Sequence, residues 1–195
     1  MRKISRSGVD ILAGAVSLVF NPFATSIGGG LLLVELTGLP AKPFLEFVVL
    51  GIAVVVLPTY IAVKSAERFY GYDLYIREER TLFYVLAMLF STVFLLLAAI
   101  LNAPVVFQKL AYAGIAAIAA GAAGNEYVKP SIHAGVLSGV AATAAFYSTF
   151  AAAVVFLLLA AVGWSRIRLE QHTAQDVIAG ALIAAASVTV AFLLV

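Results

Sequence analysis

Residues 81–101 read TLFYVLAMLFSTVFLLLAAIL, a run without a single charged side chain. A helix needs about 20 apolar residues to cross the hydrocarbon core of a bilayer, and this run meets that length. The rest of the chain has the same character, because 64% of its 195 residues are hydrophobic and 11% are charged. Soluble domains carry about 25% charged residues. The sequence therefore predicts an integral membrane protein.

Further apolar segments lie on both sides of this run. Together with it they occupy residues 9–36, 42–63, 81–101, 105–124, 132–147, 149–164 and 172–195. Short polar stretches or stretches containing Pro and Gly separate them, as is typical of helix ends. No stretch reads as a soluble domain. We therefore expect residues 1–195 to form one all-α membrane domain, a bundle of about six to seven transmembrane helices.

The first apolar segment follows a basic N-terminus, as a signal peptide would, but it is longer than a signal peptide. We expect it to be retained as a helix that is kinked or partly unwound at Asn21-Pro22 and at Gly28-Gly29-Gly30. The chain has no cysteine, which excludes disulfides and thiolate metal sites. A net charge of +2 is too small to indicate nucleic-acid binding. A homo-oligomer is compatible with this composition.

The distribution of basic residues predicts the orientation in the membrane. Counting crossings from the N-terminus places the loops 64–80, 125–131 and 165–171 on the N-terminal side. Of the 12 Lys and Arg residues, all except Lys42 and Lys109 fall on that side. Cytoplasmic loops of membrane proteins carry an excess of Lys and Arg. The N-terminal side is therefore predicted to face the cytoplasm.

The two histidines of the chain lie on this same side, each at the start of an apolar segment. His133 opens the segment 132–147 and His172 opens the segment 172–195. Arg80 ends a polar run just before residues 81–101. Polar and ionisable groups at membrane depth are costly, so their convergence on one face predicts a functional site.

The sequence around both histidines follows recognisable motifs. Residues 165–176 read SRIRLEQHTAQD and match the pattern S-R-x-x-x-x-x-H-x-x-x-D at every fixed position. Residues 130–133 read PSIH and match three of the four positions of P-S-G-H, while Arg80 matches the arginine of K-x-x-x-x-x-x-R-P. In the order and spacing of these motifs, from about residue 64 to its end, the chain resembles the type 2 phosphatidic acid phosphatase superfamily, which also includes vanadium haloperoxidases.

This resemblance implies a lipid phosphatase with two catalytic histidines. His172 would attack phosphorus and form a phosphohistidine, and Asp176 would orient its ring and stabilise the developing charge. His133 would protonate the leaving alkoxide and then activate water. The substrate phosphate would be bound by arginine forks, a hydroxyl and a lysine. These groups belong to Arg80, Arg166, Ser131 and Lys129. The scheme requires no cofactor and no metal, and the bilayer supplies the substrate.

Three departures from the motifs affect the phosphate site. Asp73 stands where the first motif has lysine, Thr81 stands in place of its proline, and Ile132 replaces the glycine of P-S-G-H. Lys129 or Arg77 is a candidate for the missing cation. Asp176 also has a second interpretation, since Thr173-x-x-Asp176 is a capping box that would start a helix.

The sequence leaves the substrate and one question of function open. Segments 132–147 and 149–164 are shorter than a usual span, which indicates a site recessed to headgroup depth. A glycerolipid phosphate and an isoprenoid monophosphate or diphosphate fit equally well. Two alternatives remain: a lipid-phosphate binding or transport protein with weakened or lost catalysis, or a phosphotransferase that passes the phosphoryl group to an alcohol.

Overall fold

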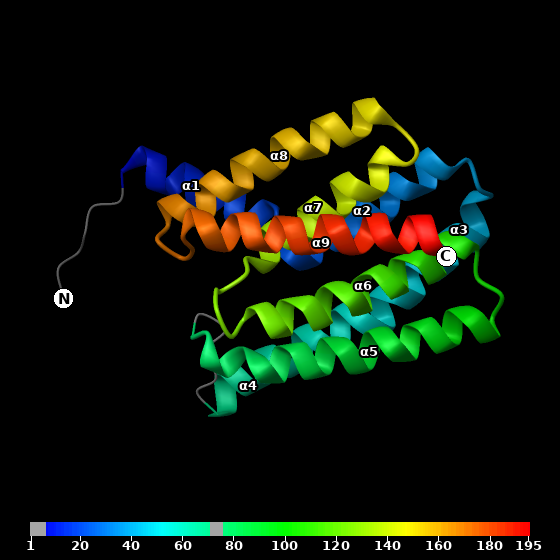
Figure 1. The fold of residues 1–195 in the computed structure, drawn as a ribbon, viewed down its shortest axis with the longest axis horizontal. Helices are drawn as coiled ribbons and strands as arrows, with labels where there is room; N and C mark the ends of the chain where they lie inside the picture. The colour runs from blue at the N-terminus through cyan, green and yellow to red at the C-terminus, as the bar shows by residue number, and fades with distance from the viewer. Residues whose placement is uncertain (1–6, 71–75) are drawn as a thin grey trace.

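The computed structural model describes residues 7–70 and 76–195, and Asp73 lies outside them. All regular secondary structure in the described residues is helical, which confirms the all-α membrane bundle (Figure 1). In chain order the elements are α1 Gly8–Val19, α2 Pro22–Thr37, α3 Ala41–Gly51, the π-helical turn η1 Ile52–Val56, α4 Leu57–Tyr70, the 3-10 turn η2 Glu78–Arg80, α5 Thr81–Ile100, α6 Val105–Gly124, α7 Ile132–Ala145, α8 Thr149–Arg168 and α9 Ala174–Leu194.

Several of these helices are long and apolar enough to cross a bilayer. In the part of the chain that the structure describes, five stretches qualify: Ala41–Phe69, Glu78–Ile100, Val105–Gly124, Thr149–Arg168 and Ala174–Leu194. The pair α1 and α2 adds a sixth if it is counted as one span. The apolar helix α7 has 14 residues and is shorter. The protein is therefore a multi-pass membrane protein.

The first apolar segment is broken, as expected, at Asn21-Pro22. The Asn21 side chain accepts hydrogen bonds from the backbone N–H groups of Phe23 and Ala24, both at 3.0 Å. Pro22 is well suited to the first position of a helix because it has no N–H to leave unsatisfied. A new helix thus begins at Pro22, bent by 56° from α1. The glycines at 28–30, by contrast, remain inside α2.

The connections between helices divide into two groups at opposite ends of the bundle (Figure 1). One end, which we call the motif end, carries the connections α4–α5, α6–α7 and α8–α9. The basic residues of these connections and adjoining helix termini are Lys64, Arg68, Arg77, Arg80, Lys129, Arg166 and Arg168. The three loops that the count of crossings placed on one side of the membrane therefore lie at one end of the bundle.

Helix α7 packs against α2, α8 and α9. Its start approaches α9 closely because α9 carries Gly180 there. A Cβ atom at Gly180 would lie 2.4 Å from the carbonyl oxygen of Ser131, and one at Gly135 would lie 3.2 Å from the carbonyl oxygen of Gly180. This contact brings the two histidine-bearing segments to the same place in the bundle.

Helix α8 differs from the expectation. It was expected to end at Trp164, whereas it continues to Arg168, so the prediction of a short span here is wrong. The last turn contains Arg166 and Arg168, and cations at a helix C-terminus are stabilised by the partial negative charge of its last carbonyls. The short span is α7 alone.

Candidate functional site

A cavity of about 990 Å³ lies among α2, α4, α5, α6, α7, α8 and α9. Five of the predicted site residues line it: Arg80, Ser131, His133, Arg166 and His172. The other two, Asp176 and Lys129, do not line the cavity but interact with His172. Much of the remaining wall is aliphatic or aromatic, with residues such as Leu33, Val55, Phe83, Ala113 and Val140. The cavity therefore combines a cationic and imidazole-lined region with an apolar interior.

His172 lies in the loop between α8 and α9, not on the helix that was expected to contain it. Helix α9 begins only at Ala174, with Thr173 as its N-cap. The loop turns through Glu170, which has a positive φ of 56°. Two loop N–H groups, from Gln171 and His172, then donate to the carbonyl oxygen of Arg166 at 3.1 and 3.3 Å. This tight turn holds His172 in a buried position, 7% exposed.

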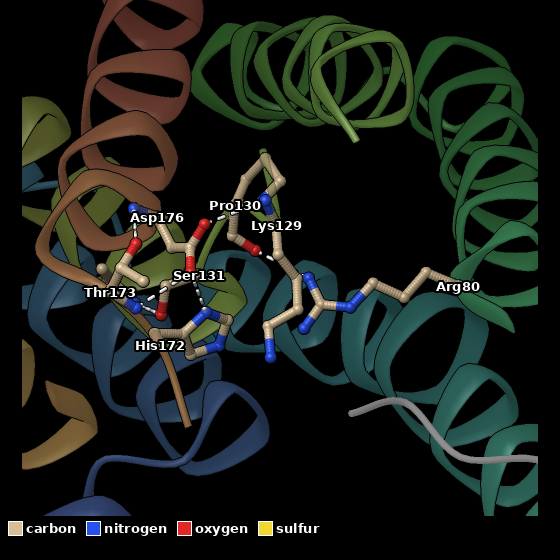
Figure 2. Close-up of polar contacts among 8 residues, drawn as sticks. Arg80, Lys129, Pro130, Ser131, His172, Thr173 and Asp176 are labelled. Atoms are coloured by element: carbon tan, nitrogen blue, oxygen red, sulfur yellow. Dashed lines mark hydrogen bonds and ion pairs between the residues drawn. The ribbon is translucent and has the colours of Figure 1, made fainter. Parts of the chain in front are cut away.

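Asp176 ties three segments together at the start of α9. Its Oδ1 accepts a hydrogen bond from the Lys129 backbone N–H at 2.9 Å, and its Oδ2 accepts one from the Thr173 backbone N–H at 2.9 Å. The Thr173 hydroxyl in turn accepts from the Asp176 N–H, so the capping box is present. The Asp176 carbonyl oxygen accepts from the Ser131 N–H at 3.0 Å. The carboxylate thereby fixes both the α6–α7 connection and α9 (Figure 2).

The contact between Asp176 and His172 is close but is not a hydrogen bond. Nδ1 of His172 lies 3.7 Å from Oδ2 of Asp176 and has no hydrogen-bond partner among the described residues. The carboxylate oxygens already accept hydrogen bonds from the backbone N–H groups of Lys129 and Thr173. Asp176 therefore lies near the ring and acts on it electrostatically, but it does not orient the ring through a hydrogen bond.

The orientation of the His172 ring determines which nitrogen can react. Because Nδ1 faces Asp176, Nε2 lies on the opposite side of the ring, toward Lys129 and the guanidinium of Arg80 (Figure 2). Burial, together with the positive charges of Arg80, Lys129 and Arg166, lowers the pKa of His172 to about 4, while the charge of Asp176 opposes this shift. The imidazole is therefore neutral near pH 7, as a nucleophile must be.

Two buried arginines reach the site from different helices. Arg80, at the start of α5, is 3% exposed and donates from Nη1 to the Pro130 carbonyl oxygen at 2.8 Å. Arg166, in the last turn of α8, is 4% exposed and donates from Nη1 to the Ser17 hydroxyl at 2.6 Å. Buried guanidinium groups of this kind are suited to bidentate recognition of an oxyanion.

The start of α7 supplies Ser131 and His133. Ser131 is fully buried and its hydroxyl caps the helix by accepting from the Ala134 N–H at 3.5 Å. The first turn of a helix also has backbone N–H groups without helical acceptors, here those of Ile132 and His133, which favour an anion. A ring nitrogen of His133 donates to the backbone carbonyl of Ser17, and His133 lies within electrostatic range of His172.

The structure distinguishes between Lys129 and Arg77, the two candidates for the cation that the first motif lacks. The charge of Lys129 acts directly on His172, and Figure 2 shows its side chain between His172 and Arg80. Arg77 instead donates to Glu78 and to the Glu126 carbonyl oxygen, at 3.2 and 3.1 Å. Lys129 is thus the cation placed at the site. Asp73, which stands in place of the lysine of the first motif, lies outside the described part of the chain.

Sequence reasoning missed the contribution of α1. The Ser165 hydroxyl donates to the Ala13 carbonyl oxygen at 2.7 Å, and Arg168 pairs with Asp10 at 2.9 Å. With the bond from Arg166 to Ser17, three contacts join α1 to the end of α8. A signal was present, because Asp10 and Ser17 are seven residues apart and share one face of an apolar helix.

Within residues 7–70 and 76–195, no group of three or more His, Cys, Asp or Glu side chains is arranged to hold a metal ion. No protein-family model, curated protein or solved structure matches the chain.

Proposed function

We propose that this protein is a membrane-embedded lipid phosphatase of the type 2 phosphatidic acid phosphatase superfamily. The observation that carries the proposal is the cavity itself, in which two histidines and two buried arginines share a wall with an extended apolar surface. A lipid phosphate has the matching halves, an anionic headgroup and a hydrocarbon tail. The substrate is a phosphate monoester or diphosphate of a glycerolipid or isoprenoid lipid.

The reaction proceeds in two displacement steps at phosphorus. Nε2 of neutral His172 attacks, the bond between phosphorus and the lipid oxygen breaks, and His133 donates its proton to the leaving alkoxide. His133 then accepts a proton from water, whose oxygen attacks the phosphohistidine and releases phosphate and neutral His172. The charge that spreads over the phosphoryl oxygens is neutralised by Arg80, Arg166 and Lys129.

The direction of access follows from the charge asymmetry of the fold. The site lies at the motif end, which holds most of the basic residues, and we propose that this end faces the cytoplasm. The tail of the substrate would occupy the apolar part of the cavity while its phosphate remains among the arginines.

One observation favours a second function, that of a lipid-phosphate binding or transport protein. The 3.7 Å separation between His172 and Asp176 leaves the imidazole without a hydrogen bond to fix its tautomer. Catalytic hydrogen bonds are often long in ligand-free enzymes and shorten when substrate binds, so this distance is compatible with both functions. A phosphotransferase would use the same first step and differ only in the acceptor.

The deciding measurement is phosphate release by the purified protein from phosphatidate and from an isoprenyl diphosphate in mixed micelles. His172→Ala should lower turnover by about 10³-fold or more because it removes the nucleophile. Arg68→Ala, which removes an exposed arginine of α4 that does not line the cavity, is the control and should keep its activity. Undiminished turnover by His172→Ala would exclude the mechanism.

The same assay separates the alternatives. Product analysis in the presence of an added alcohol would show a phosphorylated alcohol if the protein is a phosphotransferase. Saturable phosphate binding with no turnover of any lipid would instead indicate a binding protein. A phosphoryl group trapped on the wild-type chain, stable to base and labile to acid, is the signature expected for the phosphohistidine.

A further inference from the structure

The C-terminal turn of α1 contacts the site through one residue, Ser17. Its hydroxyl accepts the hydrogen bond from Nη1 of Arg166 at 2.6 Å. Its backbone carbonyl accepts from the ring of His133. One residue of α1 thus holds two cavity-lining side chains that come from α8 and α7.

The break between α1 and α2 explains why this carbonyl is available. Near the end of α1, the Phe20 N–H donates to Val16, and both the backbone and side-chain N–H groups of Asn21 donate to Leu18. The Asn21 N–H would bond to the Ser17 carbonyl oxygen if the helix continued. Because Asn21 instead caps α2, the carbonyl of Ser17 is directed to His133.

The partial negative charge at the C-terminal end of α1 suits the N–H donors of both Arg166 and His133. The C-terminus of a helix carries a partial negative charge, which stabilises nearby cations. Arg166 is 4% exposed, so its guanidinium depends on protein acceptors for both its stability and its direction. The Ser17 hydroxyl, at 2.6 Å from Nη1, restricts the directions in which the remaining N–H groups of the guanidinium point.

The other two contacts between α1 and α8 serve as an internal comparison. The Arg168–Asp10 ion pair and the Ser165–Ala13 bond join the same two helices. None of these four residues lines the cavity. Contacts that only dock α1 therefore exist beside the one that reaches the site.

We propose that Ser17 is a positioning residue, which aims the Arg166 guanidinium at the phosphoryl group and orients His133 beside it. Ser17 itself does not line the cavity, so it acts through these two side chains. The inference rests on the proposed function, because it assigns Ser17 a part in the same reaction. It makes the bent first helix a component of the site and not merely a membrane anchor.

The test compares three substitutions in the phosphate-release assay. Ser17→Ala removes the bond to Arg166 and leaves the backbone carbonyl in place. Hydrogen bonds to charged groups contribute enough for kcat to fall by about 10- to 100-fold, and KM should rise only as far as phosphate binding weakens. Ser17→Thr keeps a hydroxyl and should restore kcat to within about 5-fold of wild type. Asp10→Asn, which weakens docking alone, should leave kcat unchanged.

A second readout keeps this inference separate from the proposed function. Binding of inorganic phosphate to the purified protein, measured by calorimetry, should weaken in Ser17→Ala and not in Asp10→Asn. If the wild type binds phosphate and Ser17→Ala weakens that binding, the positioning role stands even where no lipid is turned over. Wild-type kcat and phosphate affinity in Ser17→Ala would overturn it. So would equal losses of activity and thermal stability in Ser17→Ala and Asp10→Asn, which would indicate docking alone.

Discussion

At the scale of single residues, the environment of His172 sets its chemistry. The side chain is buried, and three cationic side chains lie within electrostatic range of it. Both effects disfavour the imidazolium, which is why the pKa falls to about 4 from the ordinary 6.5. Neutral imidazole is the nucleophilic form. The imidazole of His172 is therefore neutral over the whole range from about pH 5 upward, as the proposed mechanism requires.

This environment predicts how activity responds to acid. Protonation of His172 removes the nucleophile, so kcat/KM should fall as the pH drops through about 4, well below the pKa of a free imidazole. Lys129→Met removes a cation that repels the imidazolium and should raise this limb by up to about one pH unit. The measurement is kcat/KM from pH 3.5 to 8 on one lipid, with Arg68→Ala as the control.

The same substrate must be used for every variant, because the phosphate of the lipid also titrates in this range. An acidic limb that stays in place, or moves to lower pH, in Lys129→Met would mean that Lys129 does not act on His172. Another residue would then have to supply the positive charge of the lysine that is missing from the first motif.

At this scale the sequence predicted which residues meet, but not how they bond. The motif spacing correctly indicated that His172 and Asp176 lie together, and the structure places them 3.7 Å apart. The two side chains do not lie on one helix, because His172 precedes α9. The carboxylate oxygens of Asp176 accept hydrogen bonds from two backbone N–H groups. One of these groups belongs to Lys129, which is distant in sequence. A local pattern cannot reveal such a tertiary donor.

At the scale of helices, the contact between α7 and α9 depends on the absence of a side chain at position 180. Gly180→Ala would place a Cβ atom 2.4 Å from the Ser131 carbonyl oxygen and 2.8 Å from its nitrogen. Backbone cannot yield as a flexible side chain can, so the helices must separate. We expect a loss of about 1–3 kcal/mol in the free energy of unfolding and reduced activity, since Ser131 and His133 would move.

The control for this substitution is Gly28→Ala in α2. A Cβ atom at Gly28 meets nothing within 4 Å, and alanine is the better helix former by about 1 kcal/mol. Thermal unfolding in detergent should show a lowered midpoint for Gly180→Ala and an unchanged or raised one for Gly28→Ala. Equal midpoints for the two variants would show that the close approach is not required.

The boundaries of helices were predictable where local chemistry sets them. Asn21-Pro22 marked the start of α2 because both residues suit a helix start. The end of α8 was not predictable from the apolar pattern, which stops at Trp164, because its last turn is held by partners on α1. The π-helical turn Ile52–Val56 ahead of Pro58 was likewise missed, since periodicity cannot distinguish it from an α-helix.

At the scale of the whole molecule, composition was sufficient to predict the class and the all-α bundle. The count of membrane crossings was sufficient to predict which polar segments gather at one end. The cavity was not predictable, because its wall combines residues from seven helices whose packing no single segment determines. Its shape decides how much hydrocarbon can lie beside the phosphate site, and that is a property of the assembled bundle.

Orientation in the membrane is also a property of the whole molecule, and it can be tested because the chain has no native cysteine. Tyr127→Cys places a thiol at the motif end, on a residue that is 86% exposed. Thr149→Cys places one at the start of α8, at the opposite end of the bundle. A membrane-impermeant thiol reagent added to intact cells should label Thr149→Cys, and should label Tyr127→Cys only after permeabilisation.

The physical reason for this expectation is the excess of Lys and Arg at the motif end, which resists translocation. Both variants must retain phosphate release, so that labelling reports the native orientation. The reverse labelling pattern would place the histidines on the outer face, where only lipids of the outer leaflet could supply substrate. The chemistry of His172 would then be unchanged, since burial and neighbouring charges set it, but the lipid would have to be one that reaches that leaflet. Orientation thus limits the substrate in a way that the geometry of the site alone does not.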